Sequence, residues 1–169
     1  YAYYGLAIAA LSGGVAVLSA PFVDDVLAWF PYAPDVRAAM GGYLGVRLWS
    51  VAAIVVVEAI GNWYGGLGNT RVALVAGTTT MGANVALNYA LIEPRFGLPG
   101  YGVVGAAWAS VIASWIAFVV LMVFFARGVG HDLPKAPFAF RRDEFFRMLR
   151  FGLPNGFNWF LEFGAFALF

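Results

Sequence analysis

The most constraining feature of this chain is an uncharged stretch, Phe96 to Ala126, without one Asp, Glu, Lys or Arg. An α-helix crosses the ~30 Å hydrocarbon core of a bilayer in about 20 residues. Two further uncharged runs, Tyr1–Val23 and Val72–Ile92, are long enough to do the same. With 62% hydrophobic and 11% charged residues, the composition is typical of an integral membrane protein with several helices.

Five membrane-spanning segments are predicted, and together they define an all-α, polytopic transmembrane helix bundle. Charges, prolines and glycine-rich turns set their limits. The segments are residues 1–30, 36–66, 72–92, 102–126 and 145–169, with a polar connection over 127–144. Because the chain begins and ends inside apolar runs, we expect it to be an internal piece of a longer polypeptide.

The basic residues predict how these segments are oriented. Cytoplasmic loops carry an excess of Lys and Arg. The first and third connections hold only Arg37 and Arg95. The second and fourth hold seven basic residues: Arg71, Arg127, Lys135, Arg141, Arg142, Arg147 and Arg150. We therefore expect His131 and Lys135 in the cytoplasm, and Glu93 and Arg95 outside.

Composition also limits the chemistry that the chain can perform. A net charge of +1, with the few basic residues at segment ends, gives no sign of a nucleic-acid partner, and the absence of cysteine excludes disulfides and thiol chemistry. The single histidine, His131, is interpreted as a solvated loop residue, because a metal site needs several ligands. No HExxH motif, paired acidic motif or Ser/His pair is present, so we expect no enzyme, catalytic residue or metal cofactor.

Small residues indicate that the helices pack against one another. Gly61 with Gly65, and Gly152 with Gly156, form pairs separated by three residues. A small-residue tract opens the fourth segment: Gly102, Gly105, Ala106, Ala107, Ala109 and Ser110. In a bilayer such residues let helix backbones come close where no hydrophobic force drives association. Close helix contacts are therefore expected at these positions.

A carboxylate is predicted near the middle of the membrane, where it costs about 2.5–3.5 kcal/mol on insertion scales. Glu162 lies about 18 Å along the helix axis from Arg150. It shares a face with Asn155 and Asn158, and Pro154 beside them is predicted to kink the helix. A desolvated carboxyl tends to have a raised pKa and can bind a proton reversibly. The alternative is a structural hydrogen bond.

A polar stripe is predicted on the third segment, where Thr80, Asn84 and Asn88 stand at i, i+4 and i+8. Amide oxygens can ligate a hard cation, and amide NH groups can hold a carboxylate. Ordinary hydrogen bonding between helices explains the stripe equally well. In the second segment, Glu58 is a candidate for another cavity carboxylate. It stands roughly 16 Å along the axis from Arg47, so the two cannot pair directly.

Four stretches of the chain are similar to motifs of one transporter family. Residues 65–71 (GGLGNTR) resemble G-x-G-[DN]-T-R, and residues 84–92 resemble N-x-x-L-[DN]-Y-x-L-I. Residues 102–110 resemble G-[IV]-x-G-A-A-x-A-T, and residues 150–156, followed by Glu162, resemble the start of the seventh helix. All four occur in order at matching spacing. On these residues the chain resembles the MATE family, the multidrug and toxic compound extrusion transporters, and its NorM-like branch.

The resemblance implies five helices, three to seven, of a twelve-helix protein of the wider MOP superfamily. Residues 1–126 would belong to the N-lobe, 127–144 to the cytoplasmic inter-lobe linker and 145–169 to the first helix of the C-lobe. Such proteins sit in the cell (inner) membrane and expel amphipathic or cationic drugs by alternating access. A proton or sodium gradient drives them without any further cofactor. The implied partners are these drugs, the lipid bilayer and the remaining helices of the polypeptide.

The resemblance also assigns roles to residues. Glu162 matches the acidic coupling residue of helix seven. Asn84 and Asn88 match the Asn and the Asp-or-Asn of helix five, and Ser110 stands where Thr is common. These four are the predicted cation-coupling set, with Asn84 and Asn88 as candidate Na⁺ ligands, although an amide at 88 cannot titrate. The predicted substrate cavity adds Asn155, Asn158, Glu58 and Thr80.

Cation-coupled drug export is the interpretation that fits these residues best, and three others are weighed beside it. A lipid-linked oligosaccharide flippase of the same superfamily would need a strongly basic cavity, for which the chain offers only Arg47. A membrane-embedded enzyme lacks the motifs named above. A non-transporting structural subunit would leave Glu162 without a task.

Overall fold

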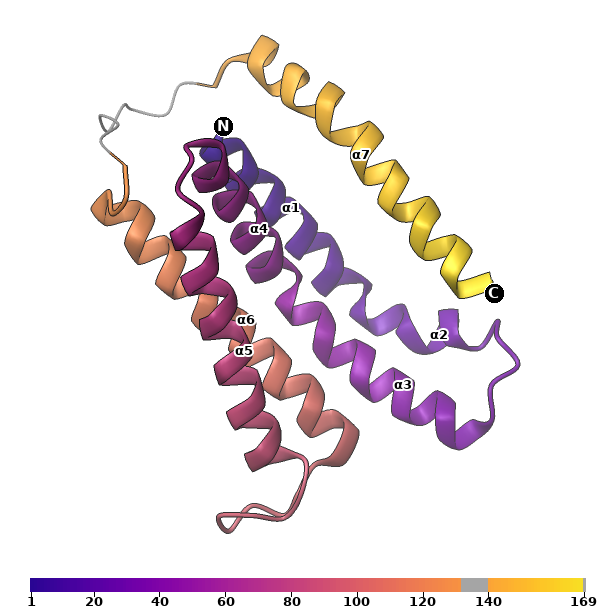
Figure 1. The fold of residues 1–169 in the computed structure, drawn as a ribbon. Coiled ribbons are helices and arrows are strands. Elements are labelled where there is room, and N and C mark those ends of the chain that lie inside the picture. The colour runs from indigo at the N-terminus through magenta and orange to yellow at the C-terminus, as the bar shows by residue number, and fades with distance from the viewer. Residues whose placement is uncertain (132–139, 169) are drawn as a thin grey trace. The chain divides into compact units, whose positions relative to one another are not determined.

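The computed structural model describes residues 1–131 and 140–168, and the regular elements of this part of the chain are all helical (Figure 1). The all-α fold predicted from the sequence is confirmed. In chain order the elements are α1 (Ala2–Ser19), η1 (Ala20–Phe22), α2 (Val23–Leu27), α3 (Pro34–Arg47), η2 (Leu48–Ser50), α4 (Val51–Gly66), α5 (Thr70–Leu91), α6 (Gly102–Arg127) and α7 (Arg142–Leu168), where η marks a 3-10 turn.

The chain divides into two compact units. The larger consists of Ala2 and Tyr4–Leu133 and contains α1 to α6, and the smaller consists of Tyr1, Tyr3 and Pro134–Phe169 and contains α7. The division falls within 127–144, the range interpreted as a linker between lobes. The assignment of the units to two lobes stays a prediction.

Three helical segments in the described part of the chain are long and apolar enough to cross a membrane. They are Ala2–Leu27, Pro34–Gly66 and Gly102–Arg127, of 26, 33 and 26 residues. The last agrees with the predicted segment 102–126, because Gly102, inside the uncharged run, and Arg127, at its end, mark the limits of the helix. The helices α5 and α7 have 22 and 27 residues but are more polar, so their predicted spanning role stays a prediction.

The second span is broken in its middle, which the sequence did not indicate. At η2 the backbone N–H of Val51 donates to the carbonyl of Leu48, and so the carbonyl of Arg47 lacks its usual α-helical donor. The hydroxyl of Ser50 donates to that carbonyl instead, at 2.7 Å. Side-chain hydroxyls of this kind commonly satisfy the backbone where a membrane helix is interrupted.

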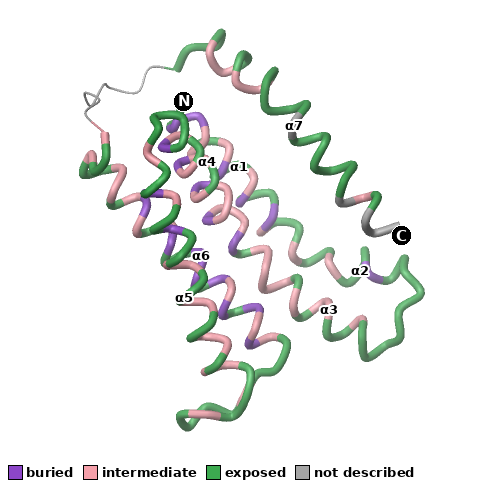
Figure 2. The backbone as a smooth tube through the Cα atoms, in the orientation of Figure 1, coloured by how far each residue is buried: buried purple, intermediate pink, exposed green. Residues whose placement is uncertain are grey.

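The core of the larger unit lies where α4 meets α1, α5 and α6 (Figure 2). Its centre on α4 is Ile60 and Tyr64, which are fully buried. The surrounding buried residues are Ala9, Val56, Val72, Ala76 and Leu121. Because α4 contributes a buried residue at every third or fourth position, one face of this helix is packed against α1, α5 and α6.

Close helix approaches occur, but mostly at other glycines than those predicted. A Cβ added to Gly5 would lie 2.6 Å from the Cβ of Ala59, and one added to Gly13 would overlap Ala52. By contrast, a Cβ added to Gly65 would meet no described atom within 4 Å. The close contact predicted at Gly65 is therefore not formed among the described residues of the larger unit, and the packing predicted at Gly152 and Gly156 stays a prediction.

The small-residue tract of α6 does pack closely, as predicted. The N–H of Tyr101 donates to the carbonyl of Leu91 at 2.8 Å, and the N–H of Gly102 donates to that of Ile92 at 3.0 Å. These bonds tie the start of α6 to the end of α5. At Gly105 an added Cβ would collide with the Leu91 carbonyl, so only glycine permits this approach.

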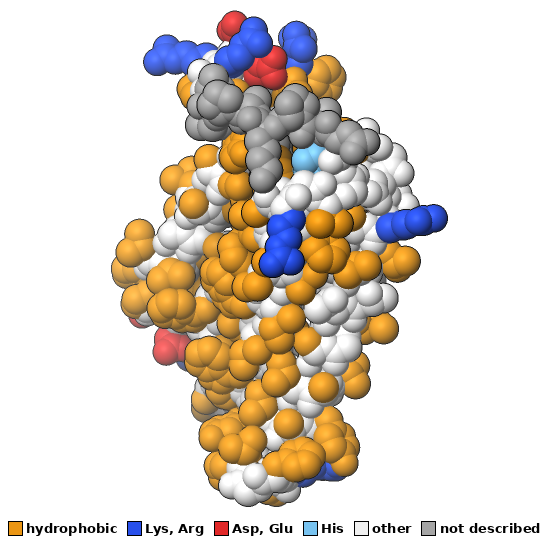
Figure 3. Space-filling view, turned by 90° about the vertical axis from the view of Figure 1, so that its left-hand side faces the viewer, with side chains coloured by type: hydrophobic (Ala, Val, Ile, Leu, Met, Phe, Trp, Pro, Cys, Tyr) orange, Lys and Arg blue, Asp and Glu red, His pale blue; other side chains and the backbone are white. Residues whose placement is uncertain are grey.

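The two faces of α6 differ in side-chain size. Small residues, Gly105, Ala107, Ala109, Ala113, Ser114 and Ala117, are buried. Large ones, Trp108, Ile112, Trp115, Ile116 and Val119, are exposed. In the space-filling view, hydrophobic side chains cover much of the face that is drawn, and charged ones are few there (Figure 3). Such a surface suits contact with hydrocarbon.

The smaller unit contains one long helix. It begins at Arg142, slightly before the predicted start at 145, because Asp143 and Glu144 suit the first turn of a helix. Nη1 of Arg141 lies 3.5 Å from Oε1 of Glu144 and forms an ion pair with it. The helix continues through Pro154 without interruption, and the kink proposed there stays a prediction.

Candidate polar site between α4, α5 and α6

A pocket of about 420 Å³ opens between α4, α5 and α6. It contains polar side chains from all three helices. Its lining consists of Ile54, Val57, Glu58, Gly77, Thr80, Met81, Asn84 and Ser114. Residues predicted separately on the second and third segments, Glu58, Thr80 and Asn84, thus line one cavity.

A chain of hydrogen bonds runs beside this pocket from α5 to α6. The amide nitrogen of Asn88 donates to the amide oxygen of Asn84 at 2.8 Å. The amide nitrogen of Asn84 donates in turn to the hydroxyl oxygen of Ser110 at 3.0 Å. Three of the four residues predicted for cation coupling are therefore in contact, and Asn84 is held in one orientation by its two neighbours.

The amide oxygen of Asn88, at one end of this hydrogen-bonded series, has no described donor. Oδ1 of Asn88 is buried and accepts no hydrogen bond from any described residue. In an apolar surrounding an unpaired amide oxygen is costly, roughly 1–3 kcal/mol. Such an oxygen can accept a hydrogen bond or ligate a hard cation.

The hydroxyl groups of the pocket are bonded to their own helices. Thr80 donates to the carbonyl of Ala76 at 2.9 Å, and Ser114 donates to that of Ser110 at 2.9 Å. Their lone pairs remain as acceptors toward the cavity. Sequence reasoning missed Ser114. Its position one turn after Ser110 was the available signal.

Glu58 supplies the carboxylate of the pocket and is itself exposed. It forms no ion pair with Arg47, as the separation along the helix predicted. Arg47 is half-buried, and its Nη1 has no hydrogen-bond acceptor among the described residues. The pocket therefore has acidic and amide character, and none of the described residues that line it is basic.

The remaining predicted residues lie on α7. Asn158, Glu162 and Pro154 are exposed on this helix, and the side chain of Asn155 lies outside the described part of the structure. The roles of Glu162 in coupling and of Asn155 and Asn158 in a substrate cavity stay predictions.

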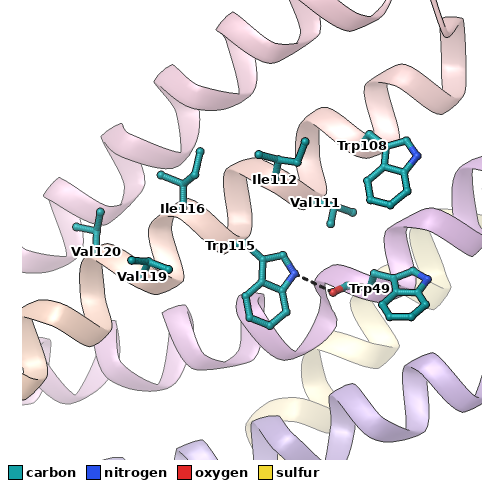
Figure 4. Close-up of a pocket in the computed structure, with 8 residues that line it drawn as sticks. All are labelled: Trp49, Trp108, Val111, Ile112, Trp115, Ile116, Val119 and Val120. Atoms are coloured by element: carbon teal, nitrogen blue, oxygen red, sulfur yellow. Dashed lines mark hydrogen bonds between the residues drawn. The ribbon is translucent and has the colours of Figure 1, made fainter.

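A second, apolar groove of about 530 Å³ lies on the outer face of α6 (Figure 4). Trp49, Trp108 and Trp115 form one part of its lining, and Val111, Ile112, Ile116, Val119 and Val120 complete it. The indole Nε1 of Trp115 donates to the carbonyl of Trp49 at 3.1 Å. This bond connects α6 to the break at η2, and it uses the indole N–H of Trp115.

The loop between α5 and α6 contains a compact charged pair. Nη2 and Nε of Arg95 lie 2.5 and 3.2 Å from Oε2 of Glu93. The guanidinium also stacks over the ring of Tyr89, 3.9 Å from its centroid. The hydrogen bonds that Arg95 donates to Glu93 raise the pKa of the Arg95 side chain above its ordinary value. The guanidinium of this pair therefore stays charged at neutral pH.

The prediction of a solvated loop position for His131 is wrong. Its ring is half-buried and packs edge-on against Trp63, with centroids 5.0 Å apart and planes at 85°. Tyr64 and Phe125 contact the same ring at 6.0 and 6.5 Å. Trp63 and Tyr64 are distant from His131 in sequence, so local composition could not reveal these two contacts.

Apolar helices of spanning length around a hydrogen-bonded polar pocket define a multispanning α-helical membrane protein. The MatE family model matches residues 1–90, more than half of the chain. The chain belongs to the MatE family.

Individual relatives agree with this assignment. The multidrug resistance protein NorM of Aliivibrio fischeri is 27% identical over 148 residues, which make up 84% of this chain and 32% of that protein. NorM of Vibrio cholerae is 28% identical over 141 residues, 79% of this chain and 31% of its own length. A probable NorM of Shewanella oneidensis is 29% identical over 167 residues, 94% of this chain and 36% of its own. The chain thus spans about a third of the length of these relatives. No solved structure gives a significant match.

Proposed function

We propose that this chain is part of a secondary active multidrug exporter of the cell (inner) membrane, which exchanges a drug for H⁺ or Na⁺ by alternating access. The membership of the MatE family and the names of the relatives support this proposal. Those names speak of multidrug resistance and not of oligosaccharide transport, so they favour a drug exporter over a flippase.

One observation carries the proposal beyond family membership. The bonded series Asn88–Asn84–Ser110 borders a pocket that contains the carboxylate of Glu58, inside an otherwise apolar bundle. The Oδ1 of Asn88 has no donor among the described residues, and an unsatisfied polar group costs several kcal/mol in hydrocarbon, which favours a functional role for the site. Its acceptor oxygens and single carboxylate suit a coupling cation or a cationic, amphipathic drug.

In the proposed mechanism the cation and the drug stabilise different access states. Glu162 on α7 binds the coupling cation, and the amide oxygens of Asn84 and Asn88 offer further ligands in the larger unit. Glu58, Thr80, Asn155 and Asn158 contribute to the drug cavity. A ligand shifts such an equilibrium only by its difference in affinity for the two states. Loss of a cation ligand should therefore abolish coupling without unfolding the protein.

The test uses the full-length protein in everted membrane vesicles, with efflux of a fluorescent organic cation under an imposed proton or sodium gradient. Glu162→Gln is expected to insert normally and lose coupled export, while Glu162→Asp keeps part of it because the charge remains. Asp143→Asn removes one carboxylate at the start of the same helix and should transport normally. Wild-type rates from Glu162→Gln at equal expression would show that this carboxylate is not the coupling group.

Asn88 gives an independent test of the larger unit. Asn88→Leu removes the orphan acceptor oxygen and the donor to Asn84, so it should stop gradient-driven efflux at normal protein levels. Val85→Leu alters an exposed apolar residue of the same helix and serves as the control. Full transport by Asn88→Leu would remove the asparagine series from the mechanism.

A further inference from the structure

The segment that follows α6 is folded back onto the turn between α4 and α5. The hydroxyl of Tyr64 donates to the carbonyl of Val129 at 2.9 Å. The amide nitrogen of Asn69 donates to the carbonyl of Gly130 at 2.9 Å. We call this arrangement the clasp, formed by residues 128–131 with Trp63, Tyr64 and Asn69. It joins parts of the chain that are more than sixty residues apart.

The backbone of the clasp requires glycine at two positions. Gly128 and Gly130 have φ angles of +70° and +80°, a conformation that glycine adopts without steric cost. A Cβ at residue 130 would also collide with the amide of Asn69. The two glycines of residues 128–131 therefore allow this segment to fold back onto the turn between α4 and α5.

The side chain of Asn69 bonds to the clasp and does not cap its own helix, α5. It occupies the N-cap position of α5, where asparagine usually accepts a hydrogen bond from the first turn, yet it makes no such bond. A capping bond is worth about 1 kcal/mol. Its side chain bonds to Gly130 instead, which gives a structural role to the asparagine of the 65–71 motif.

Aromatic packing closes the clasp on its other side. The ring of His131 lies against Trp63, Tyr64 and Phe125, and the Tyr64 side chain is fully buried. The ends of α4 and α6 and the start of α5 thus meet at one place. These are the three helices that line the polar pocket.

We infer that the clasp stays closed throughout the transport cycle and carries the beginning of the connection to α7 as a rigid part of the larger unit. This inference rests on the proposed export function. Any movement of the connection is then transmitted to α4, α5 and α6 together, and so to the pocket between them. The clasp acts as a mechanical attachment and does not itself switch.

A reversible cross-link across the clasp tests this inference. The pair Trp63→Cys and His131→Cys is introduced into a cysteine-free full-length protein, because the two native rings are in contact, with centroids 5.0 Å apart. A short bifunctional thiosulfonate joins the two thiols through disulfides that a reductant cleaves. We expect cross-linking at the same yield with and without an imposed gradient. We also expect export by the cross-linked protein within about twofold of the reduced protein, and the two single-cysteine variants serve as controls.

Loss of export on cross-linking, restored by a reductant, would show that the clasp opens and would overturn the inference. Failure of the pair to cross-link in folded protein would overturn it as well. If the protein exported no drug even when reduced, the proposed function would fail, while the cross-linking yields would still decide whether the clasp moves.

A second variant covers the case in which the cysteine pair does not fold. Asn69→Asp keeps the shape of the side chain but cannot donate to the Gly130 carbonyl, and it remains a good N-cap for α5. Hydrogen exchange at residues 128–131 should become at least tenfold faster, while exchange at the start of α5 should not. Unchanged exchange at 128–131 would mean that the bond from Asn69 does not hold the clasp.

Discussion

The amide nitrogen of Asn84 lies 3.0 Å from the hydroxyl oxygen of Ser110, and this hydrogen bond joins the polar stripe of α5 to the small-residue tract of α6. Both residues stand where the sequence predicted a cation-coupling site, but the bond itself needs the register of two helices. That register is set nearby, where Gly105 allows α6 to approach the end of α5. Packing and polar chemistry are therefore connected at this contact.

Removal of the Ser110 hydroxyl should weaken the contact. Ser110→Ala leaves the Asn84 amide without its acceptor, and we expect the free energy of unfolding to fall by roughly 0.5–1.5 kcal/mol, the usual range for a hydrogen bond between membrane helices. Ser110→Thr keeps the hydroxyl and serves as the control. The measurement is thermal unfolding of the purified full-length protein in detergent. Equal stability of both variants would contradict a structural contribution of the bond.

The approach of α6 to α5 should depend on glycine at 105. Gly105→Ala places a methyl group against the Leu91 carbonyl, and overpacking of this kind costs about 1–3 kcal/mol. Gly65→Ala is the matched control, because a Cβ there would meet no described atom within 4 Å. Its stability should be unchanged or raised by up to about 1 kcal/mol through helix propensity. If Gly65→Ala lowered the free energy of unfolding more than Gly105→Ala, the close approach of α6 to α5 at Gly105 would be contradicted.

The break in the second span should depend on Trp115. Trp115→Phe keeps most of the ring but loses the bond to the Trp49 carbonyl, so we expect a loss of about 0.5–1.5 kcal/mol in the free energy of unfolding. Trp108→Phe changes the same groove at a residue that donates no bond within the described part of the chain. Comparison of the two melting temperatures isolates the hydrogen bond. Identical shifts would mean that only ring size matters.

The orientation in the membrane can be tested by cysteine labelling in a cysteine-free background. A thiol at Glu93→Cys should react with a membrane-impermeant reagent in intact cells. One at Arg127→Cys should react only after permeabilisation. The reason is the excess of basic residues in the second and fourth connections. Labelling at 127 but not at 93 in intact cells would reverse the topology.

Much of the fold could be predicted because its signals are local. The uncharged run, with Gly102 inside it and Arg127 at its end, defined α6 almost to the residue. The turn between α4 and α5 was equally clear from its glycines, and Gly68 does take a positive φ there. The polar stripe was visible from helical periodicity, and its residues do lie beside one cavity.

What the sequence missed depends on contacts between distant residues. The break at η2 has no proline or glycine, and it is held by Ser50 and by Trp115 from another helix. His131 resembled a loop residue because Trp63 and Tyr64 are far away along the chain. The glycine pair at 61–65 has the right spacing, but spacing does not say which face meets a partner. The roles of the α7 residues stay predictions for the same reason.

The two faces of α6 differ in side-chain size, and this difference should determine which substitutions each face tolerates. On the buried face, a methyl group added at Ala109 or Ala113 must displace a neighbouring helix, since both residues are fully buried. On the other face, Ile112, Ile116 and Val119 are exposed, and one apolar side chain can replace another there with little change in contacts. Accepted substitutions in α6 should therefore recur with the helical period. A catalogue of tolerated variants would then reveal the orientation of this helix without a structure.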